Sequence, residues 1–187
     1  AITVYRSAGY GSRVELPVIP LNPADYSGFW YDAEKPGTGV SLEVQEGVLY
    51  LNWFVYDNTG LPVWFTSGGA MTGPYHYSGP LMNWNGWPLG GGYGGAQAST
   101  VGSVDLTFNS ASRARLTWRR GTGTGSQSLV KFMDDAAPGS RDFRDITGWW
   151  YDPAFEGMGF FIEAQGNNLF MTWYHYRGDG TPRWWTS

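Results

Sequence analysis

Hydrophobic and polar positions alternate along two neighbouring stretches of the chain, residues 39–45 and 49–56, with Leu49, Leu51 and Trp53 on one side of the second. A period of two residues predicts β-strands. A short aromatic run at 28–32 precedes them, and the small polar residues of Asp57-Asn58-Thr59-Gly60 are typical of a tight hairpin turn before a strand that Pro62 opens. Residues 25–67 are therefore expected to form a four-stranded antiparallel meander.

This stretch occurs twice, because a shift of 120 residues places residues 25–67 on residues 145–187 without a gap. Identical pairs include Gly28/Gly148, Trp30/Trp150, Asp32/Asp152, Glu43/Glu163, Gln45/Gln165, Trp53/Trp173, Pro62/Pro182 and Trp64/Trp184. An internal repeat of this kind sets the architecture before any motif is considered. The second copy is expected to form a second meander.

Three more strands are predicted between the copies, at 101–108, 114–119 and 126–133, whereas the glycine- and aromatic-rich stretch before them is expected to be a long loop with at most one short strand. No long window has a helical period. The predicted fold class is all-β, a duplicated antiparallel meander that forms barrel- or sandwich-like modules, either fused or separate, with little or no helix. The expected division is a first β unit at 1–67, a loop at 68–100 and a second β unit at 101–187.

The N-terminus resembles part of the segment between the copies. Residues 1–6 align with 114–119, and Gly11-Ser12 aligns with Gly125-Ser126 after a one-residue gap. Residues 1–20 are therefore expected to contain a hairpin like the one formed by the strands predicted at 114–119 and 126–133.

The repeated frame also resembles a known module. Gly28-Phe29-Trp30-Tyr31-Asp32, Gly37-Thr38-Gly39 and the stretch from Trp53 to Trp64, with their counterparts in the second copy, are similar to a tandem β-repeat of secreted proteobacterial proteins of unassigned function. The resemblance implies a module of eight strands, and it carries no catalytic residues. By this comparison residues 25–133 supply one whole module, and residues 145–187 supply strands one to four of another.

Charge and composition narrow the possible partners. The net charge is −4 with only two lysines, Lys35 and Lys131, so a nucleic-acid interface is not expected. There is no cysteine and no apolar run long enough for a membrane-spanning helix. A chain that starts at Ala1 with a strand-like segment is expected to be secreted or on the cell surface after removal of a signal peptide.

Catalytic and metal-binding constellations are not expected. The two histidines, His76 and His175, occupy different kinds of segment, and no Gly-x-Ser-x-Gly elbow is present. The turn at Asp57 lacks the later glutamate of a calcium loop, and Asp32 and Asp152 are interpreted as caps of backbone N–H groups. The protein is therefore expected to be neither an enzyme nor a cofactor-binding protein.

Four repeated polar residues, Glu43, Gln45, Glu163 and Gln165, fall on one face of the alternating strands. Paired carboxylates could suggest a glycosidase, but one carboxylate per copy at the same position implies two similar environments rather than one acid and one base. The alternatives are a solvated polar face, a buried glutamate hydrogen-bonded to neighbouring strands, or the polar lining of a ligand-binding barrel.

Aromatic residues outside the repeat are the candidate ligand-binding residues. The repeated tryptophans are expected to be core, whereas no strand period accounts for Tyr75, Tyr77, Trp84, Trp87 and Tyr93. These five are predicted to form an exposed stacking surface for a glycan or a partner protein.

The leading functional hypothesis is a non-catalytic extracellular structural protein. The incomplete second module, residues 145–187, would present unpaired strand edges, which residues 1–20 are expected to cover. If this hairpin comes from a neighbouring molecule, the chain polymerises into a surface fibre; if it comes from the same chain, the protein is a closed monomer. A secreted carbohydrate-binding module is the alternative, with a polysaccharide as partner, and a glycoside-active enzyme is the least supported hypothesis.

Overall fold

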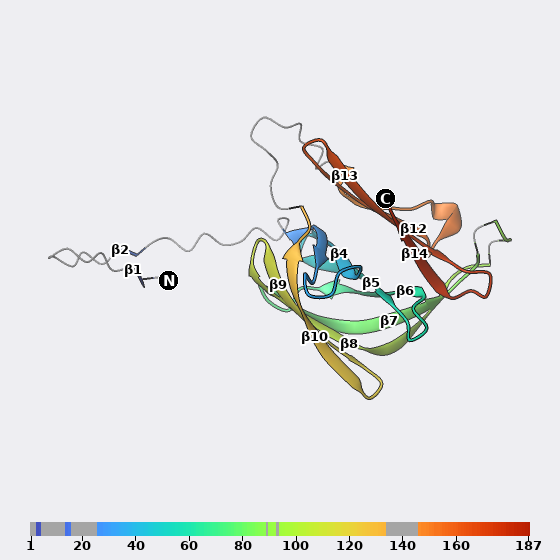
Figure 1. The fold of residues 1–187 in the computed structure, drawn as a ribbon, viewed down its shortest axis with the longest axis horizontal. Coiled ribbons are helices and arrows are strands. Elements are labelled where there is room, and N and C mark those ends of the chain that lie inside the picture. The colour runs from blue at the N-terminus through green and yellow to red at the C-terminus, as the bar shows by residue number, and fades with distance from the viewer. Residues whose placement is uncertain (1–2, 5–13, 16–25, 89, 93, 134–145) are drawn as a thin grey trace.

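The computed structural model describes residues 3–4, 14–15, 26–88, 90–92, 94–133 and 146–187. Almost every element is a β-strand, and the described residues contain no α-helix, which confirms the all-β fold class (Figure 1). Strands β1 (Thr3–Val4) and β2 (Val14–Glu15) pair only with each other. No helix in the described part of the chain has the length and apolar character to cross a membrane.

Eight consecutive strands close into an antiparallel barrel with the order β10-β3-β4-β5-β6-β7-β8-β9. They are β3 (Gly28–Tyr31), β4 (Gly39–Gln45), β5 (Val48–Tyr56), β6 (Pro62–Ala70), β7 (His76–Asn85), β8 (Gln97–Ser110), β9 (Arg113–Arg120) and β10 (Gly123–Lys131). Pairing of Lys131 with Trp30 and of Val130 with Tyr31 joins the last strand to the first. The first repeat and the three strands predicted after it therefore belong to one module.

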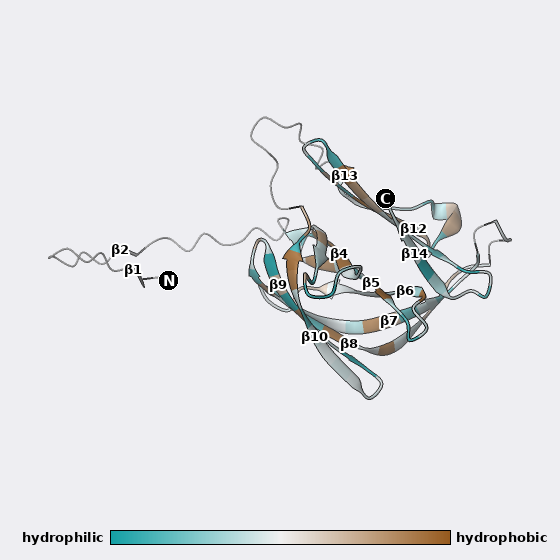
Figure 2. Ribbon diagram, viewed as in Figure 1, coloured by the Kyte–Doolittle hydropathy of each residue, from teal (hydrophilic) through white to brown (hydrophobic). Residues whose placement is uncertain are grey.

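The barrel interior is filled by every second residue of its strands. Trp30, Leu42, Leu51, Leu106 and Leu116 are fully buried there. Bands of hydrophobic and polar residues alternate along the strands, as Figure 2 shows for β7 and β8. A barrel of eight strands has an interior just wide enough for side chains to fill, so this one is a packed core.

The expected loop at 68–100 contains the whole of one strand and the ends of two others. Strand β6 continues to Ala70, β7 runs over His76–Asn85 and β8 begins at Gln97, so among the described residues of this stretch 71–75, 86–88, 90–92 and 94–96 lie outside strands. Glycine is needed in β7 for packing: a Cβ at Gly79 would overlap the Tyr77 hydroxyl, which lies 2.7 Å from Ser67 Oγ. At 76–85 the structure differs from the expected loop, because Gly79 makes room there for the inward-facing Tyr77 ring, while glycine is more often a loop signal.

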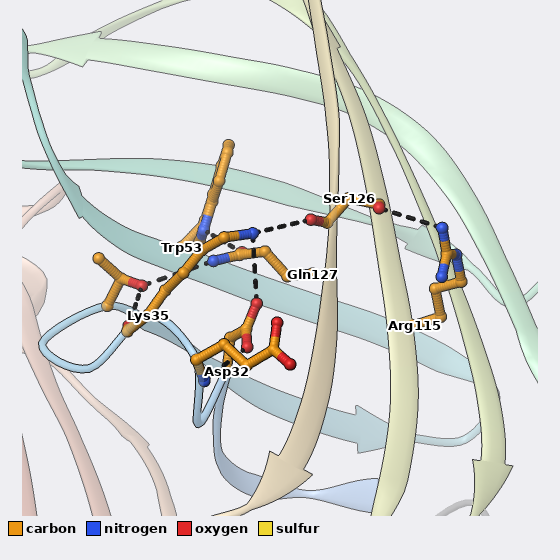
Figure 3. Close-up of polar contacts among 8 residues, drawn as sticks. Asp32, Lys35, Trp53, Arg115, Ser126 and Gln127 are labelled. Carbon is orange, nitrogen blue, oxygen red and sulfur yellow. Dashed lines mark hydrogen bonds and ion pairs between the residues drawn. The ribbon is translucent and has the colours of Figure 1, made fainter.

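Polar contacts tie the β3–β4 loop to β10 (Figure 3). Lys35 Nζ donates to Ser126 O at 3.1 Å and lies 3.4 Å from Asp32 Oδ2, while Trp53 Nε1 donates to Gln127 Oε1 at 3.0 Å. Asp32 Oδ1 also accepts from Glu34 N at 3.0 Å. These contacts hold the loop against the strand that closes the barrel.

The second repeat forms a separate four-stranded sheet in the order β11-β12-β13-β14. Its strands are β11 (Gly148–Trp150), β12 (Gly159–Gln165), β13 (Asn168–Tyr176) and β14 (Pro182–Thr186), with the 3₁₀ turn Pro153–Phe155 after β11. Asp152 caps that turn by accepting from Ala154 N at 2.8 Å. The observed sheets are thus a barrel over residues 28–131 and a second sheet over 148–186, whereas the expected division was 1–67, 68–100 and 101–187.

Candidate functional site

The barrel and the second sheet pack through the outer faces of the two repeats. In the barrel, residues that alternate with the core residues point outward. Several of them, and their counterparts in the second sheet, are large and aromatic. They form a second buried cluster of Phe29, Phe54 and Trp64 from the barrel and Phe161, Tyr174, Tyr176 and Trp184 from the sheet. Two sequence copies thus contact each other face to face.

Reciprocal hydrogen bonds from two carboxylates fix this contact. Glu163 Oε2 accepts from Phe29 N at 2.6 Å, and the equivalent Glu43 Oε2 accepts from Trp149 N at 3.0 Å. In each copy the neighbouring glutamine, Gln165 or Gln45, donates its Nε2 to the same carboxylate. The repeated Glu and Gln residues therefore join the two copies with approximate two-fold symmetry.

The repeated glycine that begins each first strand makes room for this carboxylate. Gly28 has φ of +132°, and a Cβ there would lie 2.6 Å from Glu163 Oε1. Gly148 has φ of +144°, and its Cβ would lie 3.2 Å from Glu43 Oε1. Only glycine combines this backbone conformation with so close an approach.

Two equivalent tryptophans make the other reciprocal contact. Trp64 Nε1 donates to His175 O at 3.2 Å, and Trp184 Nε1 donates to the equivalent Val55 O at 3.0 Å; Trp64 Nε1 also lies 3.1 Å from Arg183 O. Each indole therefore satisfies its N–H on the opposite copy while its ring is buried in the shared cluster.

The two carboxylates have different environments, contrary to the sequence expectation. Glu163 is 1% exposed, whereas Glu43 is only partly buried. Burial raises the pKa of Glu163 to about 7, although the Phe29 N–H, the Lys131 charge and the Gln165 amide oppose the shift. The two glutamates occupy equal positions in the repeat but differ in burial, because the two copies have different neighbours beyond their shared contact.

A cleft opens between the barrel and the sheet beside Glu43. Its volume is about 590 Å³, and residues of β4, β5 and β6 line one side while residues near β11 and β12 line the other. Neighbouring rings form a continuous wall, with centroid distances of 5.2 Å for Tyr50 to Trp149, 5.2 Å for Trp149 to Tyr174 and 6.0 Å for Tyr174 to Trp64. We take this aromatic cleft as the candidate functional site.

Two polar side chains of the aromatic cleft lack protein partners at one atom. Asn52 is 2% exposed, and neither its Oδ1 nor Trp149 Nε1 has a hydrogen-bond partner in the described structure. Tyr50 is 39% exposed, yet desolvation of its hydroxyl raises the pKa, so this phenol is neutral at physiological pH.

The five predicted stacking residues do not form one surface. Tyr77 has no exposed area and belongs to the barrel core, and Tyr75 packs against that core. Trp84 is partly buried at the junction and donates its Nε1 to Thr66 Oγ1 at 2.7 Å, whereas Trp87 is 46% exposed. Tyr93 lies outside the described residues.

Four outward-facing residues of the aromatic cleft are not among the sequence-predicted site residues: Tyr50, Asn52, Trp149 and Tyr174. A signal was present, because large aromatics on both faces of an alternating strand indicate that both faces are covered.

No protein-family model, curated protein or solved structure matches the chain.

Proposed function

We propose that the protein is a non-catalytic structural protein of the cell exterior that associates with further copies of itself by strand addition. The observation that carries this proposal is the open face of the second sheet, which corresponds to the interior of the barrel. Trp150 is 49% exposed where its counterpart Trp30 is fully buried, and Leu169 is 55% exposed where Leu49 is fully buried. An apolar face of this kind is typical of an interaction surface.

The edges of the second sheet support the same function. In the described residues β11 pairs only with β12, and β14 pairs only with β13, whereas the equivalent β3 and β6 also pair with β10 and β7. Unpaired edges beside an exposed apolar face are a template for added strands.

The proposed occupant is the β1–β2 hairpin of a second copy. The N-terminal segment resembles the β9–β10 segment in sequence, and β10 pairs with β3 in the barrel. The hairpin of one molecule would add to β11 of the next in the same way. Such a head-to-tail contact does not return on itself, so repetition produces a filament.

Light scattering and negative-stain electron microscopy test this assembly. The intact chain is expected to form polymers whose mass grows with concentration, and deletion of residues 1–20 is expected to leave a folded monomer. Leu169→Glu should also abolish polymers without lowering the unfolding midpoint, because the side chain is on the surface of the monomer. The matched control is Leu61→Glu, since Leu61 is similarly exposed but lies in the β5–β6 connection. An intact chain that stays monomeric at high concentration contradicts the proposal.

A second candidate function is polysaccharide binding, favoured by a groove of about 580 Å³ along the same sheet. Trp87, Trp150 and Trp173 line it, and tryptophan faces stack well on sugar rings. Trp87→Ala is then expected to abolish binding on a glycan array while the thermal midpoint stays nearly unchanged. The comparison variant Trp84→Ala should lower that midpoint, because the Trp84 ring is partly buried and hydrogen-bonded. An array without signal for the wild-type protein rejects this candidate.

A further inference from the structure

The aromatic cleft shares Trp150, Tyr151, Met158 and Gly159 with the groove on the open face, but Tyr50 and Trp64 on its barrel side do not line that groove. Tyr50, Trp149, Tyr174 and Trp64 line a space large enough for a small organic molecule; Tyr50 and Trp149 are its accessible rings, and Tyr174 and Trp64 are buried. The ring faces carry the negative part of the aromatic quadrupole. Such a lining attracts apolar groups and weakly hydrated cations.

The charges around the aromatic cleft are all negative. Glu43 and Glu46 are the charged residues among those that line it, and the lining contains no lysine, arginine or histidine. The hydrogen bonds from Trp149 N and Gln45 Nε2 hold the Glu43 carboxylate at the barrel side of the cleft. The unpartnered Asn52 Oδ1 adds the negative end of a buried amide dipole. An anionic ligand would be repelled, and a cation would be attracted.

The cation that fits is organic rather than metallic. Among the residues described, no group of three or more histidine, cysteine, aspartate and glutamate side chains is placed to hold a metal ion. A quaternary ammonium group needs no hydrogen-bond acceptors, and it gains cation–π attraction from ring faces within about 6 Å. We propose that the aromatic cleft binds a small molecule that carries a quaternary ammonium group.

The test compares a cation with its neutral isostere. Calorimetric titration of the intact protein with choline, with tetramethylammonium and with 3,3-dimethyl-1-butanol separates charge from shape. Choline and tetramethylammonium are expected to bind, and the neutral alcohol to bind at least about tenfold more weakly, as a cation–π contribution of ~1.4 kcal/mol or more requires.

Two variants connect that binding to the aromatic cleft. Tyr50→Leu removes an accessible ring, and Glu43→Gln removes the charge but keeps an acceptor for Trp149 N; each is expected to weaken choline binding about tenfold. The matched controls are Tyr56→Leu, a similarly exposed tyrosine outside the cleft lining, and Glu163→Gln, the equivalent carboxylate in the other copy. The unfolding midpoint of each variant shows whether it is folded.

Equal affinity for choline and its neutral isostere would overturn the proposal, as would the absence of binding to either cation. Binding of cellobiose or N-acetylglucosamine in place of choline would also overturn it and would identify the cleft as a sugar site. The polymer-deficient Leu169→Glu variant should bind choline as the wild type does, because residue 169 is not among the residues that line the cleft.

Discussion

The wild-type protein is expected to lose about 3 kcal/mol of stability between pH 4.5 and about 7, and Glu163→Gln is expected to remove this loss. The folded-state pKa of Glu163 lies near 7, above the ordinary value of 4.5, because burial disfavours the charged form. The folded protein therefore binds this proton more tightly than the unfolded chain does. The stability it contributes is complete below pH 4.5 and is lost as the pH rises through about 7.

Above pH 7 the glutamine variant should be the more stable protein, because it buries no charge and its amide oxygen still accepts from Phe29 N. The measurement is urea unfolding of both proteins from pH 4 to 8. His175 contributes the opposite slope, since burial lowers its pKa, and the difference between the two curves isolates Glu163. Glu43→Gln is the matched control and should retain the decrease. A decrease of the same size in Glu163→Gln would show that another group causes it.

Trp184→Ala is expected to release the second sheet from the barrel at a cost of about 3–5 kcal/mol. The ring of Trp184 packs against Phe54 and Tyr56, with centroids 5.5 and 5.3 Å away, and its N–H is bonded to Val55 O. Alanine would leave both a cavity and an unsatisfied carbonyl. The barrel should survive, because its eight strands close on themselves without the sheet.

Limited proteolysis with mass spectrometry provides the measurement. Cleavage is expected within residues 148–186 of the variant, while residues 28–131 stay protected. Trp87→Ala serves as the control, since this exposed indole should contribute about 0.5 kcal/mol or less to stability. Loss of protection over the whole chain at once would show that barrel and sheet unfold together.

The strands could be predicted from the sequence because their signals are local. The alternation at residues 49–56 and the turn at Asp57 involve neighbouring residues. The 120-residue repeat is visible when the two copies are compared directly. In the structure Asp57 Oδ1 accepts from Thr59 N at 2.8 Å and from Leu61 N at 3.0 Å, as a hairpin turn requires.

The aromatic cleft could not be predicted, because it depends on how two complete units pack. Glu43 and Glu163 have identical positions in the repeat, yet only the structure shows that each reaches the first strand of the other copy. Tyr77 illustrates the opposite difficulty: its glycine-rich neighbourhood indicated a loop, but the space that Gly79 leaves is filled by the Tyr77 ring itself. The partners of the two glutamates and the burial of Tyr77 both depend on which segments are close in space, and local sequence patterns do not show this.

The reciprocal contact between the two copies also limits the valency of the module. Each outer face meets an equivalent outer face, and the Glu163 and Glu43 hydrogen bonds occupy both halves of that contact. An isologous contact is saturated by two participants, so a third module has no site there. Larger arrays of such modules must therefore grow in pairs, with each new pair joined through a different surface.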